Sequence, residues 1–214
     1  MSHIAARRLE EKDRRRAEII DAAEAVAAAV GIDAMTMDLV ARQARLSRAL
    51  LYVYFEDKGD LLFALIERAL ERLQERFEEA ARQHALGIDQ IEAMGRTYVA
   101  FSQEFPVHFE ALALFESQAS DGLEAVANES ACLMRGDAVH RAMVASIHAG
   151  IADGSIRQDV EPADLVAVTL WGFMHGVIQL ASTKANVMAH RGVTMEQLVN
   201  TALAMARRSL APAP

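Results

Sequence analysis

Apolar residues return every three or four positions through most of the chain, a spacing typical of amphipathic helices rather than strands. The first long helix is predicted over residues 14–30, with Gly31 as its left-handed stop. Its apolar face carries Ile19, Ala23, Val26, Ala27 and Val30. Residues 1–13 are rich in charge, so we expect a solvated arm there. The pattern as a whole predicts an all-helical protein.

Two short helices are predicted next, over residues 37–44 and 48–54, with Thr36 and Ser47 as their N-caps. Only a few residues separate them, which is the spacing of a helix-turn-helix motif. A longer helix is predicted over residues 58–83, because a leucine-rich stripe faces a core while the opposite face is rich in Glu and Arg.

The rest of the chain continues the helical pattern. Further helices are predicted over residues 88–103, 106–118, 131–152, 162–182 and 194–208. Residues 119–130 are expected to be irregular, and the last helix begins with a capping box of Thr194 and Gln197. We therefore expect an N-terminal arm and helix-turn-helix domain over residues 1–57, a connecting helix over 58–83, and a larger helical domain over 84–214.

The composition of the chain limits which classes of function it can have. The net charge of −8 argues against a nucleic-acid partner, but residues 1–55 carry nine Lys/Arg against eight Asp/Glu, so the acidic excess lies elsewhere. Cys132 is the single cysteine and excludes an internal disulfide. No secretory segment is recognisable, and no stretch approaches the roughly 20 continuous apolar residues of a membrane span. We expect a soluble, cytoplasmic protein.

The stretch MTMDLVARQARLSRALLYVYFEDKGDLL, from Met35 to Leu62, resembles the DNA-binding region of the TetR family of transcriptional regulators in order, spacing and residue type. The matching positions are Thr36, Val40, Ala41, Ala44, Leu46, Ser47, Leu51, Tyr52, Tyr54, Phe55, Lys58 and Leu61. Three residues depart from the family pattern: Arg45 and Ala49 replace glycine, and Leu50 replaces threonine or serine. In a left-handed turn Arg45 would cost about 1–2 kcal/mol relative to glycine.

The residues themselves support a DNA-binding role. The candidate DNA-binding residues are Thr36, Ser47, Arg48, Ala49, Leu50, Tyr52, Tyr54 and Lys58. Arg48 has the donors to fork onto guanine O6 and N7, and the alanine and leucine beside it shift readout toward thymine methyls. Lys58 adds its charge to the exposed N–H groups at a helix start, where a phosphate binds well. The alternative is that the aromatic residues, Phe55 above all, belong to the core and that the hydroxyl residues only cap helices.

The C-terminal part contains LWGFMHGVIQLA, Leu170 to Ala181, which resembles the Trp-x-x-x-His-Gly helix of one branch of TetR-type C-terminal domains. The resemblance implies that the last two helices form the four-helix seam of a homodimer. An apolar ligand pocket is predicted from Phe101, Phe105, Phe109, Phe115, Trp171, Met174 and His175. The alternative is that these side chains form an ordinary core.

Two other function classes also suit an all-helical chain. An enzyme is disfavoured because the sequence has no Gly-rich phosphate loop, no His-Glu-x-x-His and no Gly-x-Ser-x-Gly. His140 and His148 lack a third ligand at a recognisable spacing, so we expect no metal and no cofactor. A protein-binding adaptor would explain the helices but not the residues from Ser47 to Lys58. We therefore predict a homodimeric repressor, not an enzyme, that leaves a palindromic operator when a largely apolar small molecule binds.

Overall fold

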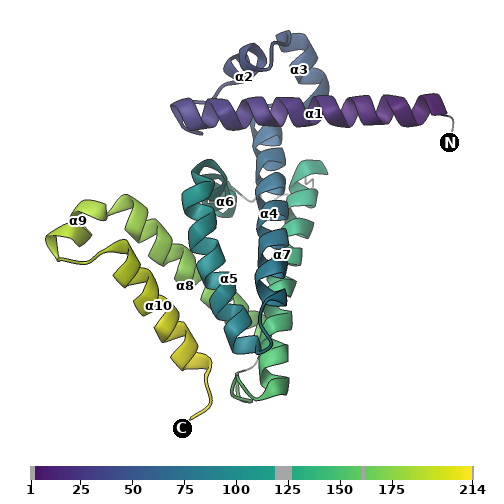
Figure 1. The fold of residues 1–214 in the computed structure, drawn as a ribbon. Coiled ribbons are helices and arrows are strands. Elements are labelled where there is room, and N and C mark those ends of the chain that lie inside the picture. Colours follow the sequence, from purple (N-terminus) through teal and green to yellow (C-terminus); the bar gives the residue numbers. More distant parts are fainter. Residues whose placement is uncertain (1–2, 119–126, 161, 214) are drawn as a thin grey trace. The chain divides into compact units, whose positions relative to one another are not determined.

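The computed structural model describes residues 3–118, 127–160 and 162–213, and the regular structure within these ranges is entirely helical (Figure 1). The helices are α1 (His3–Val30), α2 (Met37–Gln43), α3 (Arg48–Tyr54), α4 (Lys58–Arg82), α5 (Gly87–Glu104), α6 (Pro106–Gln118), α7 (Ala127–Asp153), α8 (Ala163–Thr183), α9 (Ala185–His190) and α10 (Met195–Leu210). The predicted fold class is confirmed.

The chain forms two compact units. The first comprises Met1–Leu70 with Phe105–Met134, and the second comprises Glu71–Glu104 with Arg135–Pro214. α4 and α7 therefore each contribute residues to both units, and α6 belongs to the same unit as the three N-terminal helices. The three domains predicted from the sequence are consecutive segments of the chain. The two compact units are defined by contacts, and each combines segments that are distant in the sequence.

In the first unit, α2 packs on α1 and on α3, and α6 packs on α1. Both short helices are capped as predicted: Thr36 Oγ1 accepts a hydrogen bond from the backbone N–H of Leu39 at 3.3 Å, and Ser47 Oγ accepts one from Leu50 at 3.2 Å. Arg45 lies in the turn between them with φ of 56°, the left-handed conformation in which a residue with a Cβ is strained relative to glycine.

Two helices begin earlier than predicted. α1 begins at His3 rather than at residue 14, so the expected charged arm is part of the helix, and its residues 7–13 are exposed. Ion pairs one turn apart support it, including Arg14 with Glu11 at 2.6 Å and Arg15 with Glu18 at 2.7 Å. α7 begins at Ala127, within the segment 119–130 that was expected to be irregular. Residues 119–126 of that segment lie outside the described residues.

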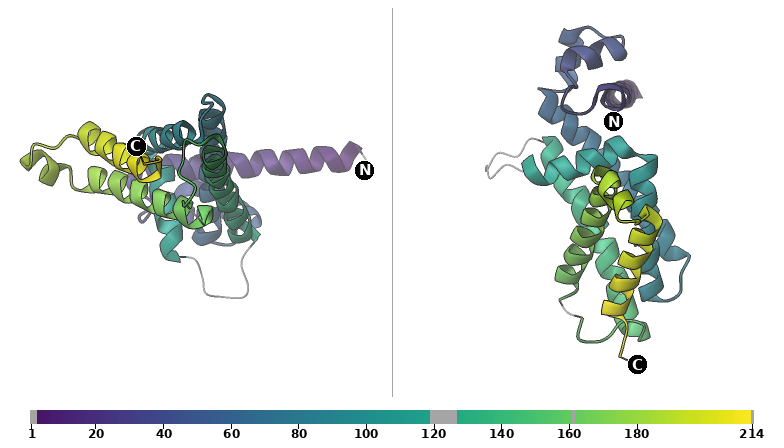
Figure 2. Two further views of the ribbon diagram at one scale, coloured as in Figure 1. Left: turned by 90° about the horizontal axis from the view of Figure 1, so that it is seen from below. Right: turned by 90° about the vertical axis from the view of Figure 1, so that its left-hand side faces the viewer.

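In the second unit, α5, α8 and α10 pack against one another. α8 and α10 lie side by side and are connected through α9, a short helix that was not predicted (Figure 2). The predicted capping box of α10 is present, with hydrogen bonds in both directions between Thr194 and Gln197. At the start of α5, a Cβ on Gly87 would lie 2.1 Å from the backbone nitrogen of Gly150, so α5 and α7 approach backbone to backbone.

α8 is the most apolar of the described helices that are long enough to cross a membrane, with a hydropathy of 1.5 over its most apolar window. A single helix of this kind is weak evidence for a membrane span, because core helices of soluble proteins have the same composition. Only a third of that window is buried within one copy of the chain, so α8 presents an exposed apolar side.

Candidate nucleic-acid interface and ligand pocket

The outer face of α3 presents the residues predicted to meet DNA. Leu51 is fully buried, and Phe55, just after the helix, is almost so, as the core alternative for Phe55 requires. The other side of the helix exposes Arg48, Ala49, Leu50 and Tyr52. This arrangement follows from the helical period, because residues 51 and 55 are four apart and share one face.

Arg48 is held by contacts on both sides of its guanidinium. Nη1 donates to Asp38 Oδ2 at 3.4 Å, and Nε lies 3.2 Å from Asp38 Oδ1. Nη2 donates to the Tyr52 hydroxyl at 3.4 Å, and Cζ lies 5.5 Å from the centre of the Tyr52 ring. The Tyr52 hydrogen bond and the nearby Asp38 carboxylate raise the pKa of Arg48, so its positive charge is retained. Sequence reasoning missed Asp38, because a carboxylate in the first turn of a helix is expected there for the helix dipole alone.

The remaining candidate residues have structural contacts of their own. Thr36 and Ser47 use their oxygens as helix caps, which leaves their hydroxyl hydrogens able to donate to a phosphate. Lys58, the first residue of α4, donates from Nζ to the carbonyl oxygen of Asp33 at 2.8 Å. Tyr54 is half-buried at the end of α3.

A polar cluster around the buried side chain of His108 joins three helices of the first unit. His108 of α6 is fully buried, and its Nε2 lies 3.4 Å from Glu24 Oε2 of α1. Arg68 of α4 forms ion pairs with Glu24 and with Asp21. Sequence reasoning missed this cluster, because its members lie on three separate helices.

The second unit contains an apolar cavity of about 40 Å³. It is lined by Phe77, Ile88, Ile91, Glu92, Met94, Gly95, Tyr98, Met143, Leu170, Trp171, Met174, Leu203, Ala206, Arg207 and Leu210. Of the residues predicted to bind a ligand, Trp171 and Met174 line it directly.

Three of the four predicted phenylalanines, Phe101, Phe105 and Phe109, are not among the described residues that line this cavity. Phe101 is fully buried in the second unit but is not part of the cavity wall. Phe105 and Phe109 belong to the first unit, where the Phe105 ring lies 5.7 Å from that of His108. Phe115 lies in α6, and its side chain is outside the described residues.

His175 is not among the residues that line the cavity, but it is hydrogen-bonded to Tyr98, which lines it. The Tyr98 hydroxyl and His175 Nδ1 are 2.8 Å apart and buried, and the ring of Trp171 meets that of His175 edge-on at 6.3 Å. Burial lowers the pKa of His175, so the neutral imidazole is favoured. A buried imidazole requires a hydrogen-bond partner, but the sequence did not show that the partner is Tyr98.

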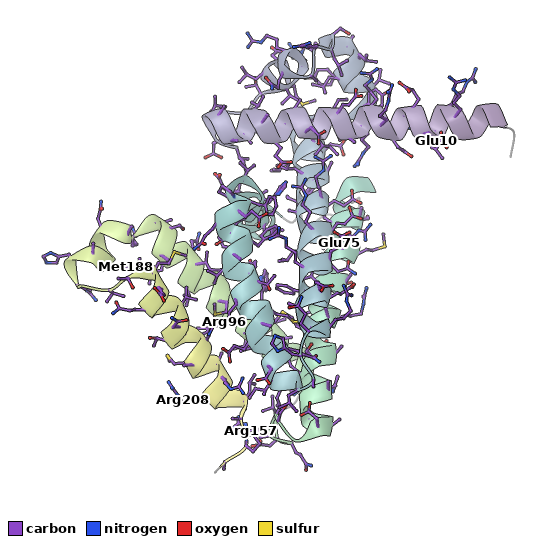
Figure 3. The ribbon with its side chains drawn as sticks, in the orientation of Figure 1. Glu10, Glu75, Arg96, Arg157, Met188 and Arg208 are labelled. Carbon is purple, nitrogen blue, oxygen red and sulfur yellow. The ribbon has the colours of Figure 1, made fainter. Side chains whose placement is uncertain are left out.

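Charged side chains at one end of the cavity are paired. Arg207 Nη1 lies 2.6 Å from Asp89 Oδ1 and 3.0 Å from Glu92 Oε2. Arg96 (labelled in Figure 3) pairs with Glu92 at 2.9 Å and donates to Asn200 of α10 at 3.1 Å. These two cations and two anions balance, so this end of the cavity carries no excess charge.

Comparison with known proteins finds a family model that matches the N-terminal part of the chain. Residues 19–65 match the family model of bacterial regulatory proteins of the tetR family. No curated protein sequence is significantly similar to the chain.

Several solved structures share the fold along nearly the whole chain. A protein with unknown function from Rhodococcus sp. RHA1 has a TM-score of 0.74 at 24% identity, over 92% of this chain and 96% of that one. The transcriptional regulator FadR from Bacillus subtilis, in complex with stearoyl-CoA, has a TM-score of 0.67 at 19% identity, over 90% of this chain and 98% of FadR. A TetR family transcription regulator from Marinobacter aquaeolei VT8 has a TM-score of 0.68 at 18% identity, over 95% and 99% of the two chains. Residues 19–65 therefore match the N-terminal domain of the tetR family, and the described chain has the all-helical fold of these solved structures.

Proposed function

We propose that this protein is a transcriptional repressor that binds a palindromic operator as a homodimer and leaves it when a largely apolar small molecule binds. The observation that carries the proposal is the outer face of α3, where Arg48 and Tyr52 are exposed within the segment that matches the tetR family. A second copy of the chain would supply a second such face, as a two-fold symmetric DNA site requires.

The exposed side of α8 supports the homodimer. Leu165, Val168 and Leu180 are 61%, 48% and 47% exposed, which is unfavourable for three large apolar side chains on one helix. Gly172 and Gly176 lie among them, and a Cβ at either position would meet nothing within 4 Å. Small residues on an exposed apolar face allow a helix of a second copy to approach closely, so we assign the dimer seam to α8 together with α10.

The oligomeric state tests this seam. We expect wild-type protein to sediment as a dimer and Gly176→Glu to sediment as a monomer, because a carboxylate would be buried between two apolar faces. Gly136→Glu is the matched control: Gly136 lies in α7, its Cβ position is also open, and a glutamate there should leave the dimer intact. A dimeric Gly176→Glu variant would show that the seam lies elsewhere.

DNA binding is tested by selecting bound sequences from a random pool, followed by titrations at several salt concentrations. We expect a two-fold symmetric site with half-sites about one helical turn apart or somewhat more. Lys58→Ala should weaken all sequences similarly and reduce the log-log salt slope by about one unit, whereas Arg48→Ala should mainly relax base preference. Equal loss of preference in both variants would contradict these roles.

The cavity supports an apolar and uncharged effector. Its wall is mainly aliphatic, aromatic and methionine side chains, and the charges at one end are already paired. A cavity of about 40 Å³ is far smaller than the roughly 150 Å³ that holds a benzene molecule, so a ligand must enlarge it on binding. Met94, Met143 and Met174 give the wall side chains that repack readily.

Trp171 is the single tryptophan and lines the cavity, so its fluorescence reports binding. A long-chain alcohol, the matching carboxylate and the matching CoA thioester form a graded probe set. We expect the alcohol to bind most tightly, because neither anion finds an unpaired cation at the cavity. Ile91→Phe, which adds volume to the wall, should weaken the alcohol without changing DNA binding.

α4 connects the two sites through one continuous helix. Lys58 begins it and Phe77, nearer its end, lines the cavity, so a ligand that enlarges the cavity acts on the helix that follows the helix-turn-helix. A coupling of about 1–3 kcal/mol would lower operator affinity roughly 5- to 150-fold, and operator must then weaken ligand binding by the same factor. Ligand affinities that do not change with operator would refute the repressor mechanism for those compounds.

A further inference from the structure

We propose that Asp38 is a positioning residue that sets base preference by fixing the guanidinium of Arg48 on the recognition face. The inference rests on the proposed DNA-binding function and adds a residue of α2 to a readout otherwise assigned to α3. In this role Arg48 donates two hydrogen bonds to a guanine from a fixed position, rather than contacting any phosphate as a mobile charge.

The geometry clamps Arg48 between two helices. Asp38 lies in the first turn of α2 and Arg48 is the first residue of α3, so their contacts at 3.2 and 3.4 Å bridge the motif. Tyr52 holds the opposite side, through its hydroxyl at 3.4 Å and its ring at 5.5 Å. A guanidinium has five N–H groups, and the described hydrogen bonds use two of them. Donors therefore remain for the O6 and N7 acceptors of a guanine.

Stability does not explain the Asp38 contact. The side chains of Arg48 and Asp38 are 63% and 56% exposed, and ion pairs exposed to this degree contribute little to folding. A carboxylate on a surface that meets phosphates also weakens binding to every DNA sequence. Asp38 compensates for this by restricting the rotamers of Arg48 before DNA binds. A fixed Arg48 favours the one base that fits its geometry.

The test compares two variants that each change one carboxylate to the matching amide. Asp38→Asn weakens the hold on Arg48, while Glu56→Gln removes an exposed charge just after α3, and no described contact joins Glu56 to Arg48. Both should raise affinity for random-sequence DNA by a similar factor of about two. Only Asp38→Asn should reduce discrimination at the base pair that Arg48 reads, by about fivefold to tenfold. That base pair is identified as the position where Arg48→Ala loses preference.

A double variant completes the experiment. In an Arg48→Ala background, Asp38→Asn should cause no further loss of discrimination, because Asp38 acts through Arg48. Wild-type discrimination in Asp38→Asn, with a loss in Arg48→Ala, would overturn the proposal. So would a loss at a cytosine position that persists in the Arg48→Ala background, since it would make Asp38 a direct reader of the cytosine amino group. A wild-type chain that selects no sequence from the pool would overturn the DNA-binding function as well.

Discussion

Replacing Arg45 with glycine should stabilise the protein, because Arg45 has φ of 56° in the turn between α2 and α3. A residue with a Cβ costs about 1–2 kcal/mol more than glycine in this conformation. Glycine also increases the conformational entropy of the unfolded chain, which lowers the free energy of unfolding by roughly 0.4–1 kcal/mol and offsets part of the stabilisation. The Arg45 side chain is exposed, and none of the described hydrogen bonds or ion pairs uses its guanidinium, so little else is lost. We expect Arg45→Gly to raise the free energy of unfolding by about 0.5–1 kcal/mol.

Urea unfolding followed by circular dichroism measures this change, at several protein concentrations because dimerisation would also affect the midpoint. Arg45→Ala is the control: it removes the same side chain but keeps the Cβ, so its free energy of unfolding should stay within about 0.5 kcal/mol of the wild type. Equal stabilisation by alanine and glycine would show that the arginine side chain, not the backbone conformation, was responsible. Destabilisation by glycine would refute the strain argument outright.

Three further predictions concern the second unit. Gly87→Ala should lower the free energy of unfolding by at least about 1–3 kcal/mol, because its Cβ would overlap the backbone of Gly150; a neutral result in urea unfolding would exclude the close approach of α5 and α7. The pKa of Asp153 is lowered by hydrogen bonds within its turn and from the N–H of Gly87. The ionised carboxylate therefore stabilises the fold at neutral pH, and this contribution is lost as the pH falls and the carboxylate is protonated. Asp153→Asn should flatten the acid side of a curve of stability against pH. Burial lowers the pKa of His175, so the unfolded chain takes up a proton first as pH falls through about 6.5 and stability declines; an unchanged slope in His175→Gln would contradict this.

Local features of the chain were predictable where neighbouring residues determine them. The caps Thr36 and Ser47 and the capping box at Thr194 were predicted because each involves hydrogen bonds within four residues. The sequence has Arg45 where the family pattern has glycine, but only the structure shows that its backbone is left-handed, with φ of 56°. The early start of α1 was missed, because residues 1–13 carry many charges and no apolar stripe, although Glu11 pairs with Arg14 one turn along the helix.

The sites depended on tertiary structure to different degrees. The exposed face of α3 could be predicted, because a seven-residue helix with Leu51 buried leaves few choices for its outer side. The cavity could not: aromatic spacing grouped Phe105 and Phe109 with Trp171, whereas the contacts place the two phenylalanines in the other compact unit. Composition identifies residues that prefer burial, but it does not say which core they enter.

The amino-acid sequence by itself determined most of the helices, the caps at Thr36, Ser47 and Thr194, and the helix-turn-helix, because hydrogen bonds and side-chain contacts within one or two turns decide them. Only the tertiary structure decided that Tyr98 is the partner of His175, 77 residues away, and that Asp38 lies against Arg48. Pairing between helices depends on their crossing angles and on which residues happen to share a layer. Those quantities are set by the packing of whole faces, to which any one residue contributes little.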